Sequence, residues 1–294
     1  MSLLKMTARK MNTLFSEKRI AVSSWTWHDA FYKGDLHLLH IPAKARESGI
    51  SQVELNDFML PPGRWSRSRG LFRWLFGQHN KNPKQRRYLQ STLSKLADEL
   101  HENNVDCISW AIETNFTVAE SLWQEELAYI KMGVQTAAKL KANMIRLTIG
   151  GSAQMGMEVD QLVIQRLKTI LAHCKRSFPI VRPIVENHWG LTTDIGRYLK
   201  IIEAVDGTGV CFDPGNIAKQ DQEEAWGRLA AKAAIFHLKI YHYHPDQLDQ
   251  NIAYCTIFDA LAANDYKGKV VIEYEGGEEP AETLKLILAQ LRES

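Results

Sequence analysis

The chain has 294 residues, of which 45% are hydrophobic, and its formal net charge is +2. No apolar run reaches the ~18 residues that span a bilayer, and residues 1–18 lack the apolar block of a secretory signal, so we expect no membrane partner. The four cysteines are widely spaced and form no C-x-x-C pair, which favours reduced core residues and a cytoplasmic location over a disulfide framework.

Eight short runs rich in β-branched residues recur along the chain, each followed by a polar turn and a longer segment. Their composition predicts β-strands. The runs cover residues 19–25, 51–56, 105–112, 143–151, 182–187, 208–213, 233–240 and 269–276.

Amphipathic segments separate these runs and predict helices between the strands. The clearest covers residues 121–142, where Leu122, Leu127 and Ile130 are spaced for one apolar face. Another is expected over 194–205, with Thr192 or Thr193 as its N-cap.

Regular alternation of strands and helices implies a parallel sheet, and eight such units fit a closed (β/α)8 barrel of the α/β class. A doubly wound open sheet is the alternative, but its Gly-rich phosphate turn, GxGxxG, is absent. We therefore expect an N-terminal arm over 1–18 and a single barrel domain over 19–294.

Four successive predicted strands each carry one potential metal ligand near the carboxyl end, where barrel enzymes place their sites. These residues are Glu186, Asp213, His237 and Glu273. Each lies two positions after an apolar residue of its own run, so that both should face the barrel interior.

A single acid at the end of a single strand is ordinarily a loop residue or an ion-pair partner. Three carboxylates converging on one barrel mouth would repel each other unless a cation lies among them. Three oxygen-donor residues and one imidazole suit a single Mn²⁺, Mg²⁺, Co²⁺ or Zn²⁺ ion, and no thiolate dictates zinc. The sequence therefore predicts a divalent metal site.

The motifs "VENHWGLTTD", "CFDPGN", "FHLK" and "VIEYEG", in this order, resemble those of the xylose isomerase-like TIM-barrel superfamily. This superfamily includes sugar phosphate isomerases and epimerases, dehydratases and apurinic endonucleases. The resemblance is strongest over residues 181–276 and weaker over 19–56. It departs from the family in the short segment after residue 240, which lacks the arginine that many epimerase-like members carry.

The resemblance implies that Glu186, Asp213, His237 and Glu273 bind one divalent ion, and that Glu186 and Glu273 are the catalytic acid and base. The implied function is an isomerase or epimerase of a small sugar, sugar phosphate or polyol, acting by proton transfer through a metal-stabilised enediolate. A metal-dependent dehydratase of a cyclic polyol or dehydroshikimate type is the alternative, because it begins with a similar proton abstraction.

Five further residues are expected to contact the substrate: Trp25, Glu54, His188, Asn216 and Lys239. The resemblance suggests this role for Glu54, His188 and Asn216, although the last two could equally cap loops. Trp25 could pack against the apolar face of a sugar, and Lys239 could reach the substrate or simply pair with an acid.

Residues 61–90 hold eight Lys or Arg and no Asp or Glu, interleaved with aromatic residues. We expect this insertion after the second strand to be a helical lid over the barrel mouth, or to bury itself against a second subunit of a homo-oligomer. Nucleic-acid binding by such a stretch is ranked lower. The apurinic endonucleases use several more histidines, and the ends of the second and third runs supply none.

Overall fold

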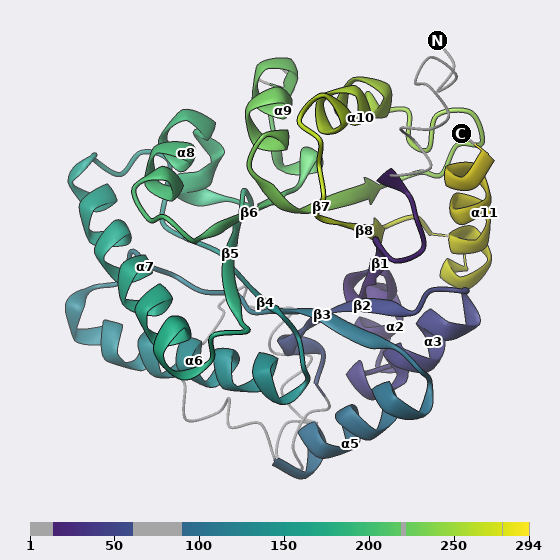
Figure 1. The fold of residues 1–294 in the computed structure, drawn as a ribbon, viewed down its shortest axis with the longest axis horizontal. Coiled ribbons are helices and arrows are strands. Elements are labelled where there is room, and N and C mark those ends of the chain that lie inside the picture. The colour runs from purple at the N-terminus through teal and green to yellow at the C-terminus, as the bar shows by residue number, and fades with distance from the viewer. Residues whose placement is uncertain (1–13, 61–89, 219–221, 278, 294) are drawn as a thin grey trace.

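The computed structural model describes residues 14–60, 90–218, 222–277 and 279–293, and the predictions for 1–13 and 61–89 lie outside these residues. Eight parallel strands close into a barrel in the order β1 to β8, which confirms the predicted α/β barrel (Figure 1). The strands are β1 Ile20–Ser23, β2 Gln52–Asn56, β3 Asp106–Ala111, β4 Met144–Leu147, β5 Arg182–Glu186, β6 Gly209–Phe212, β7 Ala233–Ile240 and β8 Lys269–Tyr274.

Helices surround the barrel and follow the strands around the ring, as Figure 1 shows. Within the described part of the chain none of them is long and apolar enough to cross a membrane. They are α2 His28–Lys33, α3 Ile41–Glu47, α5 Gln90–Glu102, α6 Glu120–Lys139, α7 Glu158–Ser177, α8 Ile195–Glu203, α9 Gln222–Ala230, α10 Tyr254–Ala263 and α11 Pro280–Glu293.

One layer of apolar side chains fills the barrel interior, apart from the larger core between the strands and the helices. It includes Ile184, Cys211, Ile235 and Val271, each two residues before one of the predicted ligands. The expected orientation of these residue pairs is therefore correct. The candidate ligands follow this apolar layer toward the carboxyl ends of the strands.

Two irregularities in strand pairing occur close to the candidate site. The register shifts between Val53 and Glu54 where β2 pairs with β3, and between Val210 and Cys211 where β6 pairs with β7. Bulges of this kind re-aim the side chains that follow them and are common beside active sites. Here they precede Glu54 and Asp213.

Two local predictions are wrong. Leu122 is 52% exposed rather than part of the apolar face of α6, where the buried neighbour is Trp123. The N-cap of α8 is Asp194, whose carboxylate accepts a hydrogen bond from the backbone N–H of Arg197, rather than Thr192 or Thr193.

The last part of the predicted N-terminal arm contacts the barrel. Leu14 and Phe15 are buried in the core, and the Phe15 ring packs edge-on against Phe258 of α10 at 4.8 Å between centroids. The predicted core cysteines Cys107 and Cys211 are buried and free.

Candidate metal and active site

The four predicted ligands lie at the carboxyl ends of four adjacent strands of the barrel. Glu186 ends β5, Asp213 directly follows β6, and His237 and Glu273 lie within β7 and β8. All four side chains are buried, with at most 4% of the residue surface exposed. The barrel therefore holds three carboxyl groups and an imidazole together, away from bulk solvent.

The Nδ1 atom of His237 is the point on which the three carboxylates converge. It lies 3.5 Å from Glu186 Oε1, 3.6 Å from Asp213 Oδ2 and 3.7 Å from Glu273 Oε2. Among the described residues, neither His237 Nδ1 nor Asp213 Oδ2 has a hydrogen-bond partner. Unpartnered buried polar atoms are costly, so this donor set fits a bound cation.

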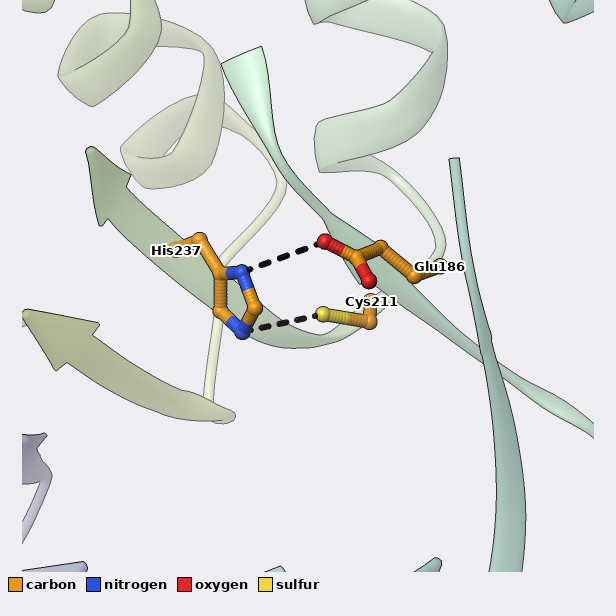
Figure 2. A group of neighbouring side chains, drawn as sticks. All are labelled: Glu186, Cys211 and His237. Carbon is orange, nitrogen blue, oxygen red and sulfur yellow. Dashed lines mark hydrogen bonds and ion pairs between the residues drawn. The ribbon is translucent and has the colours of Figure 1, made fainter. Parts of the chain in front are cut away.

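The other ring nitrogen of His237 faces a second set of groups. Nε2 lies 3.1 Å from Glu54 Oε1 and 3.3 Å from Cys211 Sγ. Figure 2 shows Glu186 and Cys211 beside different nitrogens of the ring. Two triads, Glu186 with Cys211 and His237, and Glu54 with His237 and Glu273, have ligand atoms within 4.8 Å of one another.

Cys211 is the weaker candidate for a ligand, because burial raises the pKa of its thiol and keeps it protonated. For Asp213 and Glu273 burial acts in the same direction, but nearby Lys239 and His237 outweigh it and lower the pKa of both carboxyl groups. We therefore place the candidate cation on the Nδ1 side of the ring.

Two permanent cations flank the carboxylates. Arg146 of β4 pairs with Glu186 and lies 3.3 Å from Glu54, and it donates a 2.7 Å hydrogen bond to Asn56 Oδ1. Arg146 was not predicted from the sequence as part of the site. The available signal was a charged residue inside an apolar run, two positions after Met144 of the inner layer.

Lys239 of β7 is the second cation. Its Nζ lies 2.8 Å from Glu273 Oε2, 2.5 Å from Glu275 Oε1 and 3.8 Å from Asp213 Oδ2. Lys239 therefore pairs with acids, as one of the two alternatives proposed. It also lies at the same end of the barrel as the proposed ligands Asp213 and Glu273.

These ion pairs stabilise the charged forms of Asp213, Glu273 and Lys239. Burial alone would raise the pKa of Asp213 and Glu273, but the Lys239 ammonium, together with His237, lowers both. The same carboxylates raise the pKa of Lys239 against the effect of its burial. Within the described part of the chain, five carboxylates, those of Glu54, Glu186, Asp213, Glu273 and Glu275, outnumber the cationic side chains that they contact, which are Arg146, Lys239 and His237. The excess negative charge favours a divalent ion.

Asn187, the amide residue between Glu186 and His188, holds the backbone of Asp213. It is fully buried, its Nδ2 donates to the backbone carbonyl of Asp213 at 2.7 Å, and its Oδ1 accepts from the backbone N–H of Asp213 at 2.9 Å. Asp213 Oδ1 in turn accepts from the N–H of Gly215. One carboxylate oxygen is thus fixed by the backbone, and the other, Oδ2, is presented to His237.

We expect Asn187→Ala to lower the free energy of unfolding by about 2–4 kcal/mol, because it leaves a buried backbone N–H and C=O of Asp213 without partners. Urea denaturation followed by circular dichroism measures this change. The matched control is Asn103→Ala, which removes one partly exposed hydrogen bond to Glu99 O. Equal losses in the two variants would contradict the bridging role of Asn187.

Trp25 and the two loop residues predicted to contact substrate are also near the ends of these strands. The Trp25 indole N–H donates to Glu275 Oε1, and its ring stacks on His28 at 4.6 Å. His188 Nδ1 and Asn216 Nδ2 have no hydrogen-bond partner among the described residues. Burial lowers the pKa of His188, so its imidazole is neutral near pH 7.

Glu54 differs from the other residues predicted to contact substrate. It is 0% exposed, and its Oε1 is taken up by His237 and Arg146. Glu54 therefore faces the Nε2 side of His237 and has no contact with solvent.

Comparison with known proteins gives a family and a set of similar folds. The family model for the xylose isomerase-like TIM barrel matches residues 42–293. No curated protein matches the sequence at a significant level.

Solved structures with this fold cover nearly the whole chain at low sequence identity. The probable 3-DHS dehydratase AsbF from Bacillus anthracis is 14% identical with a TM-score of 0.62, over 92% of this chain and 97% of that one. The zinc-binding IolI protein is 13% identical with a TM-score of 0.65, over 92% and 96%. D-psicose 3-epimerase from Clostridium cellulolyticum H10 is 12% identical with a TM-score of 0.64, over 94% and 96%. Identities this low establish a shared fold and nothing more about this chain.

Proposed function

Since the chain belongs to the xylose isomerase-like TIM-barrel family, we propose that it is a divalent-metal-dependent isomerase or epimerase of a small sugar or polyol derivative. The observation that carries the proposal is the convergence of three carboxylate oxygens on His237 Nδ1, within 3.7 Å. Epimerases among the structures of similar fold support it.

Glu186, Asp213, His237 and Glu273 would hold the ion. Their donor set of carboxylate oxygens and one imidazole nitrogen suits Mn²⁺, Mg²⁺, Co²⁺ or Zn²⁺. When bound, the ion would polarise the substrate carbonyl and stabilise the negative charge that develops on proton loss.

Glu186 and Glu273 are the proposed catalytic base and acid. They come from β5 and β8, and each is paired with its own cation, Arg146 for Glu186 and Lys239 for Glu273. One carboxylate would remove the proton from the carbon beside the carbonyl. Return of a proton to the opposite face would invert that carbon, whereas return to the neighbouring carbon would move the carbonyl.

His188, Asn216 and Trp25 are the proposed substrate contacts. The unpartnered Nδ1 of His188 and Nδ2 of Asn216 are suited to bind substrate hydroxyls. Trp25 is held by Glu275, which fixes the orientation of the indole that an apolar sugar face would meet.

A dehydratase is the second candidate, because its reaction begins with the same removal of a proton by a glutamate. The other glutamate would then protonate the hydroxyl that leaves as water. A probable dehydratase has the same fold. An apurinic endonuclease is less well supported, because each candidate ligand group in the described part of the chain contains His237 as its only histidine.

Chelation is the first test of the metal. Removal of divalent ions with EDTA should lower the melting temperature, and readdition of Mn²⁺, Mg²⁺, Co²⁺ or Zn²⁺ should restore it. An ion at 100 times its Kd adds about 2.7 kcal/mol to the stability, which corresponds to a shift of roughly 4–5 °C for a chain of 294 residues. Differential scanning calorimetry measures the shift, and its absence with all four ions would contradict the proposal.

The metal-loaded protein should then be incubated with a panel of sugars, sugar phosphates and acidic polyols in D₂O. Proton NMR would detect exchange beside the carbonyl, which both candidate reactions share. A new ketose or epimer identifies an isomerase or epimerase, and a rise in ultraviolet absorbance from a conjugated product identifies a dehydratase.

A further inference from the structure

The Nε2 side of His237 holds a buried arrangement to which the proposed function gives no role. Glu54 of β2 is 183 residues from His237 in the sequence, yet its Oε1 lies 3.1 Å from Nε2. Both side chains are completely buried. A carboxylate at this position accepts a hydrogen bond from Nε2–H, so that Nδ1, which faces the convergent carboxylate oxygens, is the ring nitrogen available to an ion.

Glu54 also acts on a second proposed ligand, through Arg146. Glu54 Oε1 lies 3.3 Å from Arg146 Nε, and the Nη1 atom of the same guanidinium pairs with Glu186 Oε2. The Nη2 atom donates to Asn56 Oδ1, two residues after Glu54 on β2. One strand, β2, thus fixes the guanidinium that fixes Glu186.

We propose that Glu54 is a positioning residue, which holds His237 with Nε2–H toward itself and orients Glu186 through Arg146. The inference rests on the proposed metal site, and it assigns Glu54 a place beneath the ion rather than against the substrate. Carboxylate partners of metal-binding histidines fix the ring and raise its basicity.

The alternative is that the cation binds on the Nε2 side, with Glu54 and Cys211 as ligands. Arg146 opposes this arrangement, because its guanidinium already lies 3.3 Å from Glu54 Oε1 and would repel a divalent ion there. On the Nδ1 side, Arg146 pairs with Glu186 through Oε2 and leaves Oε1 facing the ring, and Lys239 is held by Glu273 and Glu275.

The test is the affinity for Co²⁺, measured by calorimetry on the full-length protein and on three variants. Glu54→Gln should weaken binding about 10–100-fold, because the neutral amide orients His237 less firmly and pairs less strongly with Arg146. Cys211→Ser should leave the affinity unchanged. Glu126→Gln, a matched change of a buried glutamate that accepts from the N–H of Asn115 on the outside of the barrel, should also leave it unchanged.

The Co²⁺ absorption spectrum separates the two sides of the ring. On the Nδ1 side the ion has only oxygen and nitrogen ligands, so the near-ultraviolet thiolate band should be absent from the wild type. A thiolate band that disappears in Cys211→Ser would place the ion beside Nε2 and overturn the proposal, as would wild-type affinity in Glu54→Gln. Failure of the wild type to bind any divalent ion would instead refute the proposed function on which this inference rests.

Discussion

Replacing Glu186 or Glu273 by Gln should lower turnover by ~10²–10⁴-fold, the usual contribution of a general acid or base. Glutamine keeps the shape and one oxygen for an ion, but its amide cannot accept a proton. Both carboxylates are buried and paired with cations, Arg146 and Lys239, that the amide oxygen can still contact. Turnover on the substrate found by the screen is the measurement.

Isotope exchange tests whether two carboxylates act on opposite faces of the substrate. Each Gln variant should still exchange substrate protons with D₂O through its remaining carboxylate, while losing net conversion. Asp213→Asn should behave differently, because it removes a proposed ligand and should weaken metal binding without leaving a half-reaction.

Near-full turnover in both Gln variants would contradict the two-glutamate mechanism. The next candidate base would then be His188 rather than Lys239. Burial lowers the pKa of His188 and leaves it neutral near pH 7, whereas the surrounding carboxylates raise the pKa of Lys239 and keep it protonated. A group that remains protonated cannot accept the substrate proton.

The barrel and the positions of the four candidate ligands near the strand ends were predictable because both depend on local pattern. A strand alternates its side chains with a period of two, so the apolar Ile235 fixes the direction of His237 once the strand is recognised. The closed order of parallel strands then brings Glu186 and Glu273, 87 positions apart in the numbering, to the same carboxylate cluster.

The partners of the ligands were not predictable, because they depend on contacts across the barrel. Nothing near Glu54 in the sequence indicates that its carboxylate meets His237, and nothing near Arg146 indicates that it pairs with Glu186. Register shifts before Glu54 and at Cys211 re-aim these strands in ways that periodicity does not reveal. The prediction for Leu122 was wrong for a similar reason, because the elements that pack on a helix determine which of its faces is buried.

The ion pairs of Lys239 are consistent with two roles, holding the proposed ligands in place or acting on the substrate, and an experiment can distinguish them. Its ammonium lies 2.8 Å from Glu273 Oε2 and 3.8 Å from Asp213 Oδ2, so it lies beside two proposed ligands. A cation there lowers the affinity of those oxygens for a divalent ion by charge repulsion. The same cation would stabilise negative charge that develops on the substrate.

Lys239→Met should therefore lower turnover without weakening metal binding. Turnover should fall by ~10²–10³-fold, the usual loss on removal of one electrostatic donor. The Kd for Mn²⁺ should stay the same or decrease, because the competing positive charge is gone. The matched control is Lys269→Met at the start of β8, the opposite end of the barrel, where Lys269 Nζ donates to Gln52 Oε1. It should alter neither value. If turnover and metal affinity fell together in Lys239→Met, the lysine would be holding the ligands in place instead of acting on the substrate.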